Sequence, residues 1–520
     1  MTFDEKIKQV FADMIVLKDP ERSEFFSNLS MPSYMRDWIV MKFSDNKGNV
    51  DFDSTLAYIK RFIPSRDDFK SIKYRLMQGN TEKMLARVRL EVNLKKGIVQ
   101  FELPDFGGSR GGASGIVSDD VLDQYADSLL KESENWGIIE LSLGQTLSGN
   151  DEFEKPAKSS RFFNKLLGRK NSDDYEESRR FYLPNEIYLS GYKPFCPYKI
   201  DLDFYKDARK QFDIHEWIDV VISAVDYNPA GYTDENGNVS EEAKLFFLRR
   251  LLPFVEKRVN LIELAPKGTG KSYVYEKISK RGWLISGGTV SRASLIYDNA
   301  RKTGGLLTRF DYVGFDEVQS ITFEQPGQIQ QALKHYMEFG EIKGFDAQMS
   351  ADAGVIVLGN IDASKFDINK NMVENISTVF GESATLDRFH GFIEGWRIPR
   401  MNQDLIAHGW ALNTEYFAEV LHELRSDLTY AAIVDDCLDT PPKADKRDMT
   451  AIKRICTAFV KLLYPNARNK GDIAPDEFIK YCLNPAKEMR AIIKKQLCII
   501  DPKEFDVAGK RDIPDVKYKD

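Results

Sequence analysis

A short phosphate-binding motif carries the strongest chemical signal in this sequence of 520 residues. The motif reads Ala265, Pro266, Lys267, Gly268, Thr269, Gly270, Lys271 and Ser272. Its two glycines let the backbone curl so that successive N–H groups face an anion, and Lys271 reaches the β- and γ-phosphates of a nucleotide. The hydroxyl of Ser272 is suited to ligate Mg²⁺. The motif therefore predicts that the chain binds ATP together with magnesium.

Two later segments supply polar side chains that complete a hydrolytic site. The apolar run from Tyr312 ends in two carboxylates, of which Asp316 is expected to hold magnesium and Glu317 to polarise the attacking water. A second apolar run from Val355 ends in Asn360, which is expected to orient that water. Because an asparagine after a strand is commonly a turn former, its assignment depends on the order of the three motifs.

These residues need a scaffold that brings distant segments of the chain together. Arg258 to Leu264 predicts a buried strand, and the motif then runs into a helical segment that contains Tyr273 and Ile278. Onward from this strand, short apolar runs alternate with helical patterns, which is typical of a parallel sheet with crossover helices. We therefore predict an α/β core with helices on both faces of a parallel sheet.

Composition and charge are those of an ordinary globular protein. The chain is 42% hydrophobic and 29% charged, and its net charge of −7 gives no global electrostatic argument for binding nucleic acid. The first residues lack the basic start and apolar run of a secretion signal, so a cytoplasmic protein is expected. The five cysteines form no C-x-x-C pair and predict neither a zinc site nor a disulfide framework.

Smaller structural units are expected before the core. Residues Phe3 to Phe43 show helical spacing, and alternation in Ala86–Leu94 and Ile98–Leu103 predicts two strands that form a hairpin. Gly107 to Gly115 is expected to be a flexible loop, and Gly149 to Arg180 a mobile insertion. The basic residues of that insertion fit either contact with phosphates or a solvated loop.

The order of the motifs resembles that of the AAA+ family of ATPases. After the Asn360 strand comes Leu386-Asp387-Arg388-Phe389, and the resemblance implies that Asn360 is a sensor-one residue and Arg388 an arginine finger given to a neighbour's ATP. Leu333 to Phe345 resembles the helix and pre-sensor-one hairpin of MCM-type helicases, which implies that Lys343 faces a pore and contacts DNA. An exposed hairpin lysine is also often only solubilising, so both interpretations of Lys343 stay open.

A longer resemblance, in order along most of the chain, is to the Lon-related BrxL family of bacterial BREX phage-defence systems. The stretches that carry it are Met35–Val40, Trp217–Asp219, Tyr227–Pro229, Asn260–Tyr275, Ile285–Gly288, Gly395–Pro399 and Lys461–Pro465. The resemblance implies an MCM-like ATPase that forms homo-hexameric rings, single or stacked in pairs, binds or encircles duplex DNA and works with other BREX proteins. Longer members continue into a Lon-like domain with a Ser-Lys dyad; since this sequence ends at Asp520, no protease activity is expected.

Four segments are expected along the chain. These are a helical cap at 1–60, an α+β amino-terminal domain and candidate DNA-binding unit at 61–208, an AAA+ core at 209–400 and a helical carboxy-terminal lid at 401–520. Within the lid, Arg454 occupies the place of a sensor-two arginine that touches the γ-phosphate, with Lys453 as the alternative. Basic residues on a helix face are more commonly only solvated.

Three functions remain compatible with the sequence. The leading hypothesis is a DNA-binding ring ATPase, and its principal rival is a protein-remodelling AAA+ machine, which predicts an aromatic pore loop. Phe345 beside Lys343 leaves room for that rival. A slow, nucleotide-controlled scaffold is the third, although the complete set of catalytic residues argues mildly against it. No base-reading motif is evident, so DNA binding is expected to be phosphate-directed and steeply salt-dependent.

Overall fold

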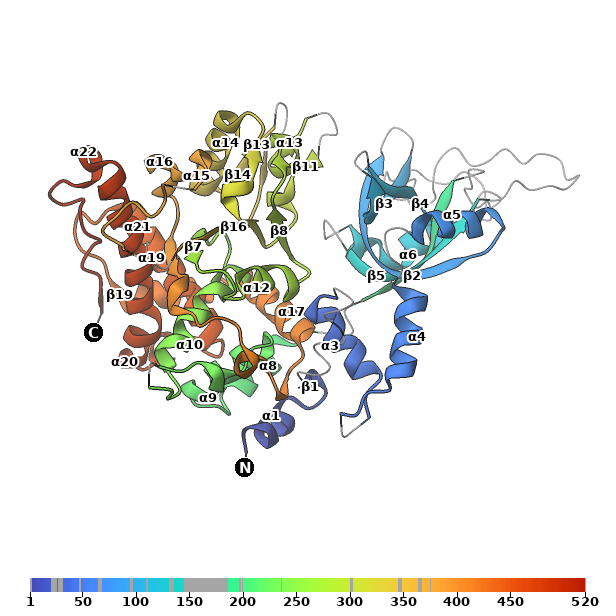
Figure 1. Cartoon of the computed structure of the whole chain (residues 1–520), viewed down its shortest axis with the longest axis horizontal. Helices are drawn as coiled ribbons and strands as arrows, with labels where there is room; N and C mark the ends of the chain where they lie inside the picture. Colours follow the sequence, from blue (N-terminus) through green and yellow to red (C-terminus); the bar gives the residue numbers. More distant parts are fainter. Residues whose placement is uncertain are drawn as a thin grey trace, which may run out of the picture. The chain divides into compact units, whose positions relative to one another are not determined.

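The computed structural model describes residues 2–519 apart from a set of gaps. The residues left out are 20–25, 27–30, 46–47, 64–67, 94–96, 109–110, 131–134, 145–185, 196–197, 199, 235, 300–302, 345–347, 363–366 and 375. The chain forms two compact units, one of Met1–Lys42 with Ile200–Asp520 and one of Phe43–Lys199 (Figure 1). These boundaries differ from the expected ones, and residues 401–520 belong to the same unit as the core. Among the described residues, no helix combines the length and apolar character needed to cross a membrane.

A five-stranded parallel sheet with strand order β17-β7-β16-β12-β8 forms the centre of the first unit. Its strands are β7 (Leu261–Ala265), β8 (Gly282–Ser286), β12 (Tyr312–Asp316), β16 (Gly354–Asn360) and β17 (Gly391–Glu394). Asn360 lies beside Ala265 in the register, and Phe315 beside Val357. Because all strands run in the same direction, the carboxyl ends of β7, β16 and β12 meet at one edge. The predicted parallel sheet is confirmed.

Helices cover both faces of this sheet, as expected. They include α11 (Leu252–Val255), α12 (Lys271–Lys277), α14 (Pro326–Phe339) and α21 (Asn484–Ile500). On one face, alternate side chains of β7, β12 and β16 join α14 and α21 in a single apolar cluster. On the other face, the ring of Tyr312 lies 4.5 Å from that of Phe254 on α11 and 5.8 Å from that of Tyr275 on α12. Burial on both faces explains why the strand sequences are mostly apolar.

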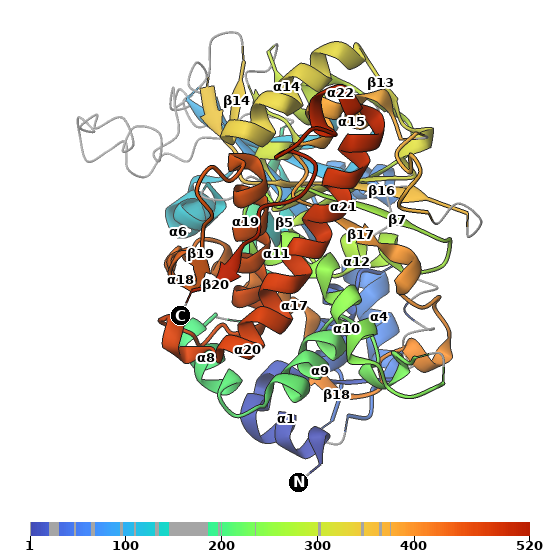
Figure 2. The same ribbon diagram turned by 90° about the vertical axis from the view of Figure 1, so that its left-hand side faces the viewer.

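Further helices before and after the sheet complete the first unit (Figure 2). They are α1 (Phe3–Phe11), α3 (Ser33–Lys42), α8 (Leu202–Arg209), α9 (Ile214–Ala224), α10 (Glu241–Leu248), α17 (Thr414–Arg425), α18 (Thr429–Cys437) and α19 (Lys446–Leu463). The long helices α19 and α21 lie against each other, as Figure 2 shows. Strand β1 (Ile15–Lys18) was not expected; it pairs with the distant β18 (Gly409–Leu412), a contact that local periodicity cannot reveal.

The second unit is a closed barrel with strand order β2-β3-β4-β6-β5. Its elements are α4 (Phe52–Phe62), α5 (Phe69–Met77), β2 (Glu82–Asn93), β3 (Ile98–Gly108), β4 (Gly111–Val117), α6 (Asp119–Leu129), β5 (Asn135–Leu143) and β6 (Ile187–Pro194). Paired strands are antiparallel except for β4 with β6, which are parallel, and α6 connects β4 to β5. This is the topology of the OB-fold, a five-stranded Greek-key barrel.

Of the features predicted for this unit, the hairpin is confirmed and the flexible loop is not. The predicted hairpin is confirmed, since β2 pairs with β3 from Arg89 opposite Glu102 to Asn93 opposite Ile98. The flexible loop expected at 107–115 is wrong for most of its length, because β3 continues to Gly108 and β4 begins at Gly111. A Cβ at Gly115 would lie 2.1 Å from the carbonyl oxygen of Ile187, so this glycine permits close strand approach. The insertion expected at 149–180 lies outside the described residues.

A buried charge network ties the amino-terminal segment to the helix after the phosphate-binding motif. Asp226 lies 2.6 Å from the Lys18 ammonium and 2.5 Å from the Arg36 guanidinium, and it accepts a hydrogen bond of 2.8 Å from the hydroxyl of Tyr273 on α12. Burial alone would raise the pKa of Asp226, but the charges of Arg36 and Lys18 lower it below its ordinary value.

We predict that Asp226→Asn destabilises the first unit by about 3 kcal/mol at neutral pH, because the buried cations Lys18 and Arg36 are then left with the single carboxylate of Asp37. Asparagine tolerates the left-handed backbone at this position, where φ is 73°. Because the folded-state pKa is lowered, the stabilisation is present above the ordinary carboxyl pKa of about 3.9 and is lost as the pH falls through the folded value. Denaturant unfolding at several pH values measures both effects.

The matched control is Asp435→Asn, which removes the exposed ion pair of 2.7 Å with Lys453. It should change the stability by less than about 1 kcal/mol. Equal effects of the two substitutions would contradict the importance assigned to the buried network.

Candidate active site

The phosphate-binding motif forms a tight loop between strand β7 and helix α12. Gly268 and Gly270 have φ values of 82° and 74°, in the left-handed region that glycine adopts without strain. A Cβ at Gly270 would also lie 2.2 Å from the hydroxyl oxygen of Tyr227, so a larger residue is excluded there. Pro266 is half-buried, Lys267 is exposed and Thr269 is buried. The strand-loop-helix context predicted for the motif is confirmed.

Lys271 begins helix α12 and is held at the carboxyl edge of the sheet. Its ammonium group donates a hydrogen bond of 2.6 Å to Oδ1 of Asn360, at the end of β16. Burial lowers the pKa of Lys271, and the nearby carboxylates of Glu263 and Asp316 partly oppose this shift. A desolvated cation of this kind gains strongly from an anionic ligand, which is the property required of a phosphate-binding lysine.

Ser272 and Asp316 come together from α12 and β12. The Ser272 hydroxyl donates to Oδ2 of Asp316 at 2.6 Å, while Oδ1 accepts the backbone N–H of Glu317 at 2.9 Å. A hydroxyl and a carboxylate fit Mg²⁺, which binds one or two protein oxygens and completes its shell with waters and phosphate oxygens. In the part of the chain that the structure describes, no group of three or more His, Cys, Asp or Glu side chains forms a separate metal site.

Glu317 and Asn360 face each other beside this pair. The Asn360 amide nitrogen lies 3.4 Å from Oε1 of Glu317, which is a weak hydrogen bond. Glu317 is exposed and has a φ of 47°, an unfavourable conformation for a non-glycine residue. Such strain costs roughly 1–3 kcal/mol and is concentrated at functional sites. The arrangement places a carboxylate and an amide side by side, where one water molecule could contact both.

Arg388 lies apart from this cluster. Its guanidinium contacts the Glu338 carboxylate at 3.2 Å and the carbonyl of Ala384, and none of these groups belongs to the phosphate-binding loop. Burial lowers the pKa of Arg388 and the nearby Arg447 adds to the shift. The structure thus does not bring Arg388 to the nucleotide site of its own chain.

The structure does not place Arg454, the proposed sensor-two residue, at the phosphate-binding loop of its own chain. Its guanidinium donates to the carbonyl oxygen of Arg258 and lies beside Nε2 of His390, each at 3.2 Å. Both partners precede strands of the parallel sheet, so Arg454 lies at the amino edge, opposite the phosphate-binding loop. A strand of five residues separates the two edges by about 16 Å. The alternative, Lys453, pairs with Asp435 at 2.7 Å. The local helical pattern could not show which edge this helix approaches.

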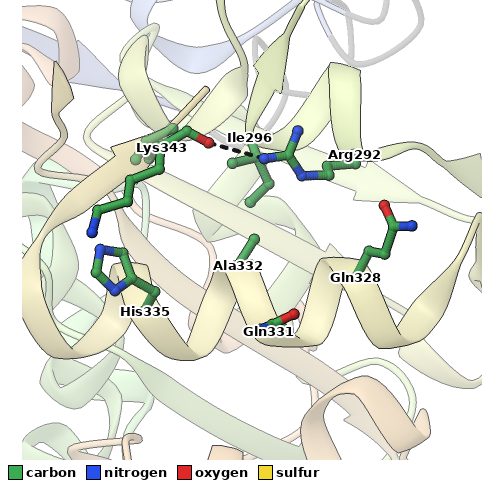
Figure 3. Close-up of a pocket in the computed structure, with 8 residues that line it drawn as sticks. Arg292, Ile296, Gln328, Gln331, Ala332, His335 and Lys343 are labelled. Atoms are coloured by element: carbon green, nitrogen blue, oxygen red, sulfur yellow. Dashed lines mark hydrogen bonds between the residues drawn. The ribbon is translucent and has the colours of Figure 1, made fainter. Parts of the chain in front are cut away.

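Lys343 lines a cavity of about 610 Å³ outside the nucleotide site (Figure 3). It ends strand β14 (Glu341–Lys343), which forms a short antiparallel hairpin with β15 (Gln348–Ser350). The other lining residues are Arg292, Ile296, Gln328, Gln331, Ala332, His335 and Ile342. Arg292 donates a hydrogen bond of 2.9 Å to the carbonyl of Lys343. The cavity combines cationic and amide side chains with the apolar side chains of Ile296, Ala332 and Ile342. This combination suits an anionic ligand that also has flat apolar parts. Phe345 lies outside the described residues.

Sequence reasoning missed two buried residues beneath the loop. Arg250 and Glu263 are fully buried and form an ion pair with a closest approach of 2.5 Å. The available signal was the charge of Glu263 within an otherwise apolar strand, since an isolated buried charge is too costly to occur without a partner. The partner itself, 13 residues earlier in the chain, had no pattern that would identify it.

Known proteins resemble this chain along most of its length. Residues 187–510 match the family model "Lon-like protease BrxL-like, ATPase domain", and residues 9–143 match "BREX system Lon protease-like protein BrxL N-terminal". The Lon-like protease BrxL of Escherichia coli O9:H4 (strain HS) is 26% identical over 509 residues, covering 96% of this chain and 65% of that protein. For its counterpart from Bacillus cereus (strain H3081.97) the values are 26% over 501 residues, 94% and 66%. The chain thus spans just under two thirds of these relatives' length.

The geometry predicts that two substitutions separate nucleotide binding from hydrolysis. Lys271→Ala should abolish detectable ATP binding, because the buried cation is removed, whereas Glu317→Gln should bind ATP and reduce turnover by at least about 100-fold. Equilibrium binding and steady-state phosphate release measure the two steps. Lys267→Ala, in the same loop but exposed, should have a smaller effect than Lys271→Ala. Full hydrolysis by Glu317→Gln would refute the assigned role of Glu317.

Proposed function

The chain belongs to the BrxL family, and we propose that it is a magnesium-dependent AAA+ ATPase that forms rings on duplex DNA and serves in BREX-type defence. One observation carries this proposal: Lys271, Asn360, Ser272 and Asp316, drawn from two neighbouring strands and the helix that follows a third, form two hydrogen-bonded pairs of 2.6 Å. The match to an ATPase-domain model supports nucleotide as the ligand.

In the proposed reaction, water attacks the γ-phosphate in line with the leaving oxygen. Lys271 neutralises charge on the β- and γ-phosphates, while Ser272 and Asp316 would hold magnesium. Bound magnesium stabilises charge on the transferred phosphoryl group. Glu317 polarises the attacking water. Asn360, which contacts both Glu317 and Lys271, orients this water relative to the γ-phosphate. Positioning and electrostatic stabilisation provide most of the rate enhancement.

Arg388 is proposed to act on the nucleotide of a neighbouring subunit. Arg388 contacts groups outside the phosphate-binding loop of its own chain, which supports a role at a neighbour's site. An arginine that a partner supplies to a hydrolytic site is worth about 10³–10⁵ in rate. Glu338 holds Arg388 and also contacts Arg447 at 3.1 Å, so these groups form one charged surface. The helices from α17 to α21 supply the proposed lid, in which Arg454 contacts Arg258 and His390 at the amino edge of the sheet.

Two features support DNA as the partner. The second unit has the OB-fold topology, and OB-folds bind oligonucleotides on the face of their second and third strands, which here are β3 and β4. In the first unit, the hairpin of Lys343 and the neighbouring Arg292 place two cations on one cavity. Since the net charge of the chain is −7, local groups such as these would have to provide the contacts with phosphates.

A mixing experiment tests whether Arg388 acts in trans. Arg388→Ala and Lys271→Ala should each be inactive alone, since one lacks the finger and the other lacks the nucleotide. Mixed subunits should regain part of the wild-type ATPase rate, because some interfaces then combine an intact site with an intact Arg388. Absence of recovery in a mixture shown to form mixed oligomers would contradict the role in trans.

The DNA proposal predicts that Lys343→Ala weakens duplex binding. The slope of log K against log salt should become shallower by about 0.9 for each DNA phosphate that the variant no longer neutralises. Lys370→Ala, an exposed lysine in the same unit, is the matched control and should leave the slope unchanged. Fluorescence anisotropy at several salt concentrations, with ATPase rates measured with and without DNA, gives both readouts. Wild-type ATPase activity indifferent to DNA, with no DNA retained at low salt, would favour protein remodelling or scaffolding.

A further inference from the structure

Three successive carbonyl groups of the phosphate-binding loop accept hydrogen bonds from outside the motif. The carbonyl of Gly268 accepts the backbone N–H of Met401 at 2.8 Å. The carbonyl of Thr269 accepts Nη1 of Arg250 at 2.7 Å. The carbonyl of Gly270 accepts the Tyr227 hydroxyl at 3.3 Å and also the N–H of Val274 in helix α12. The three outside donors come from distant parts of the chain.

Because peptide bonds are planar, these hydrogen bonds also orient the N–H groups of the same peptides. In a planar trans peptide, the C=O and the following N–H point in opposite directions. A donor that fixes the carbonyl of Thr269 therefore turns the N–H of Gly270 away from itself. The same holds for the N–H groups of Thr269 and Lys271. These groups are thus directed away from the three donors. The loop is also open at Gly268, where a Cβ would meet nothing within 4 Å.

We propose that Arg250, Tyr227 and the backbone of Met401 are tethers that hold the loop in its anion-binding conformation, with Arg250 as the principal positioning residue. This inference rests on the proposed nucleotide function of the loop. The tethers bind the carbonyl side of the loop, opposite the N–H groups, and touch no substrate. They fix the directions of three N–H groups before the nucleotide arrives.

Arg250 is suited to this role because Glu263 fixes its guanidinium. Glu263 accepts from Nε at 3.1 Å and from Nη2 at 2.5 Å, which leaves Nη1 to reach the carbonyl of Thr269. Nη2 also lies 3.3 Å from the hydroxyl of Thr269. Burial opposes the charge of Arg250, but the Glu263 carboxylate outweighs this and raises the pKa of Arg250 above its ordinary value. The bond to the loop is therefore charge-assisted, and such bonds are roughly twice as strong as neutral ones.

Tyr227 provides a weaker tether. Its side chain is 2% exposed, and burial raises the pKa of its hydroxyl, so the group remains a protonated donor at neutral pH. The space it occupies lies against Gly270, where a Cβ would meet the hydroxyl oxygen at 2.2 Å. Because the bond of 3.3 Å is long, the contribution of Tyr227 should be smaller than that of Arg250.

The tethers should lower the conformational cost of binding a diphosphate or triphosphate group. A loop that is already ordered loses less entropy on binding, and its N–H dipoles need no reorientation. Removal of a tether should consequently weaken nucleotide affinity without moving Asp316 or Glu317. The expected kinetic result is a KM for ATP that rises by a larger factor than kcat falls.

The experiment compares two double variants of the full chain. Arg250→Met with Glu263→Gln removes the principal tether without leaving an unpaired buried carboxylate. Arg425→Met with Asp311→Asn is the matched control, because Arg425 is also buried, pairs with Asp311 at 3.3 Å and donates to the carbonyls of Glu256, Asp311 and Asp352. Those carbonyls precede β7, β12 and β16, so the control removes a similar group at the opposite edge of the same sheet.

The dissociation constant for ADP, measured by titration calorimetry, should rise about tenfold or more in the Arg250 variant, as expected when a hydrogen bond to a charged group is removed. It should change less than about twofold in the Arg425 variant. Equal weakening in both would indicate general loosening of the fold and would overturn the inference. So would an unchanged dissociation constant in a folded Arg250 variant.

Tyr227→Phe keeps the inference testable if the Arg250 variant does not fold. It removes only a hydroxyl and should raise the dissociation constant for ADP about threefold, within the range of one neutral hydrogen bond. Unchanged affinity in Tyr227→Phe would then overturn the set of tethers. A wild-type chain that binds no ADP would instead refute the proposed function itself, so the two failures are distinguishable.

Discussion

Parallel pairing of β7, β16 and β12 is the constraint on which the site depends. The three strands lie side by side in the sheet and run in one direction, so that the residues at their carboxyl ends are brought together although almost 100 positions separate Ala265 from Asn360. Each strand is largely apolar and buried between helices, with the paired Glu263 as the charged exception in β7, and that burial fixes the sheet. The polar groups at the edge contact one another, as Lys271 with Asn360 and Ser272 with Asp316.

Buried charged residues hold the loop and the helix that lie at this edge. Arg250 with Glu263 lies beneath the phosphate-binding loop, and Asp226 joins the amino-terminal segment to Tyr273 of helix α12. A buried ion pair is a poor source of stability compared with a well-packed apolar group. Its advantage here is directional, since a guanidinium held by a carboxylate points its remaining donor at one carbonyl. The loop and its helix are thus held by groups that lie outside the motif.

Local sequence patterns predicted the strands and the motif because both are local properties of the chain. The hairpin of β2 and β3 was predictable for the same reason. Long-range pairings were not: β1 with β18, the barrel closed by β6 and the position of Arg454 at the amino edge all depend on contacts between distant segments. The glycines at 107–115 resembled a loop because composition does not distinguish flexibility from close strand packing. Roles for Arg388 and Lys343 came from family resemblance and remain predictions.

Dependence of ATP turnover on magnesium tests the central claim most directly. In the proposed mechanism, Ser272 and Asp316, paired at 2.6 Å, share a metal ion with the phosphates of ATP. Phosphate release by the wild-type chain should therefore be steady with Mg²⁺, absent with excess chelator and restored when Mg²⁺ is returned. No turnover under any of these conditions, or turnover that persists unchanged with the chelator, would contradict the account.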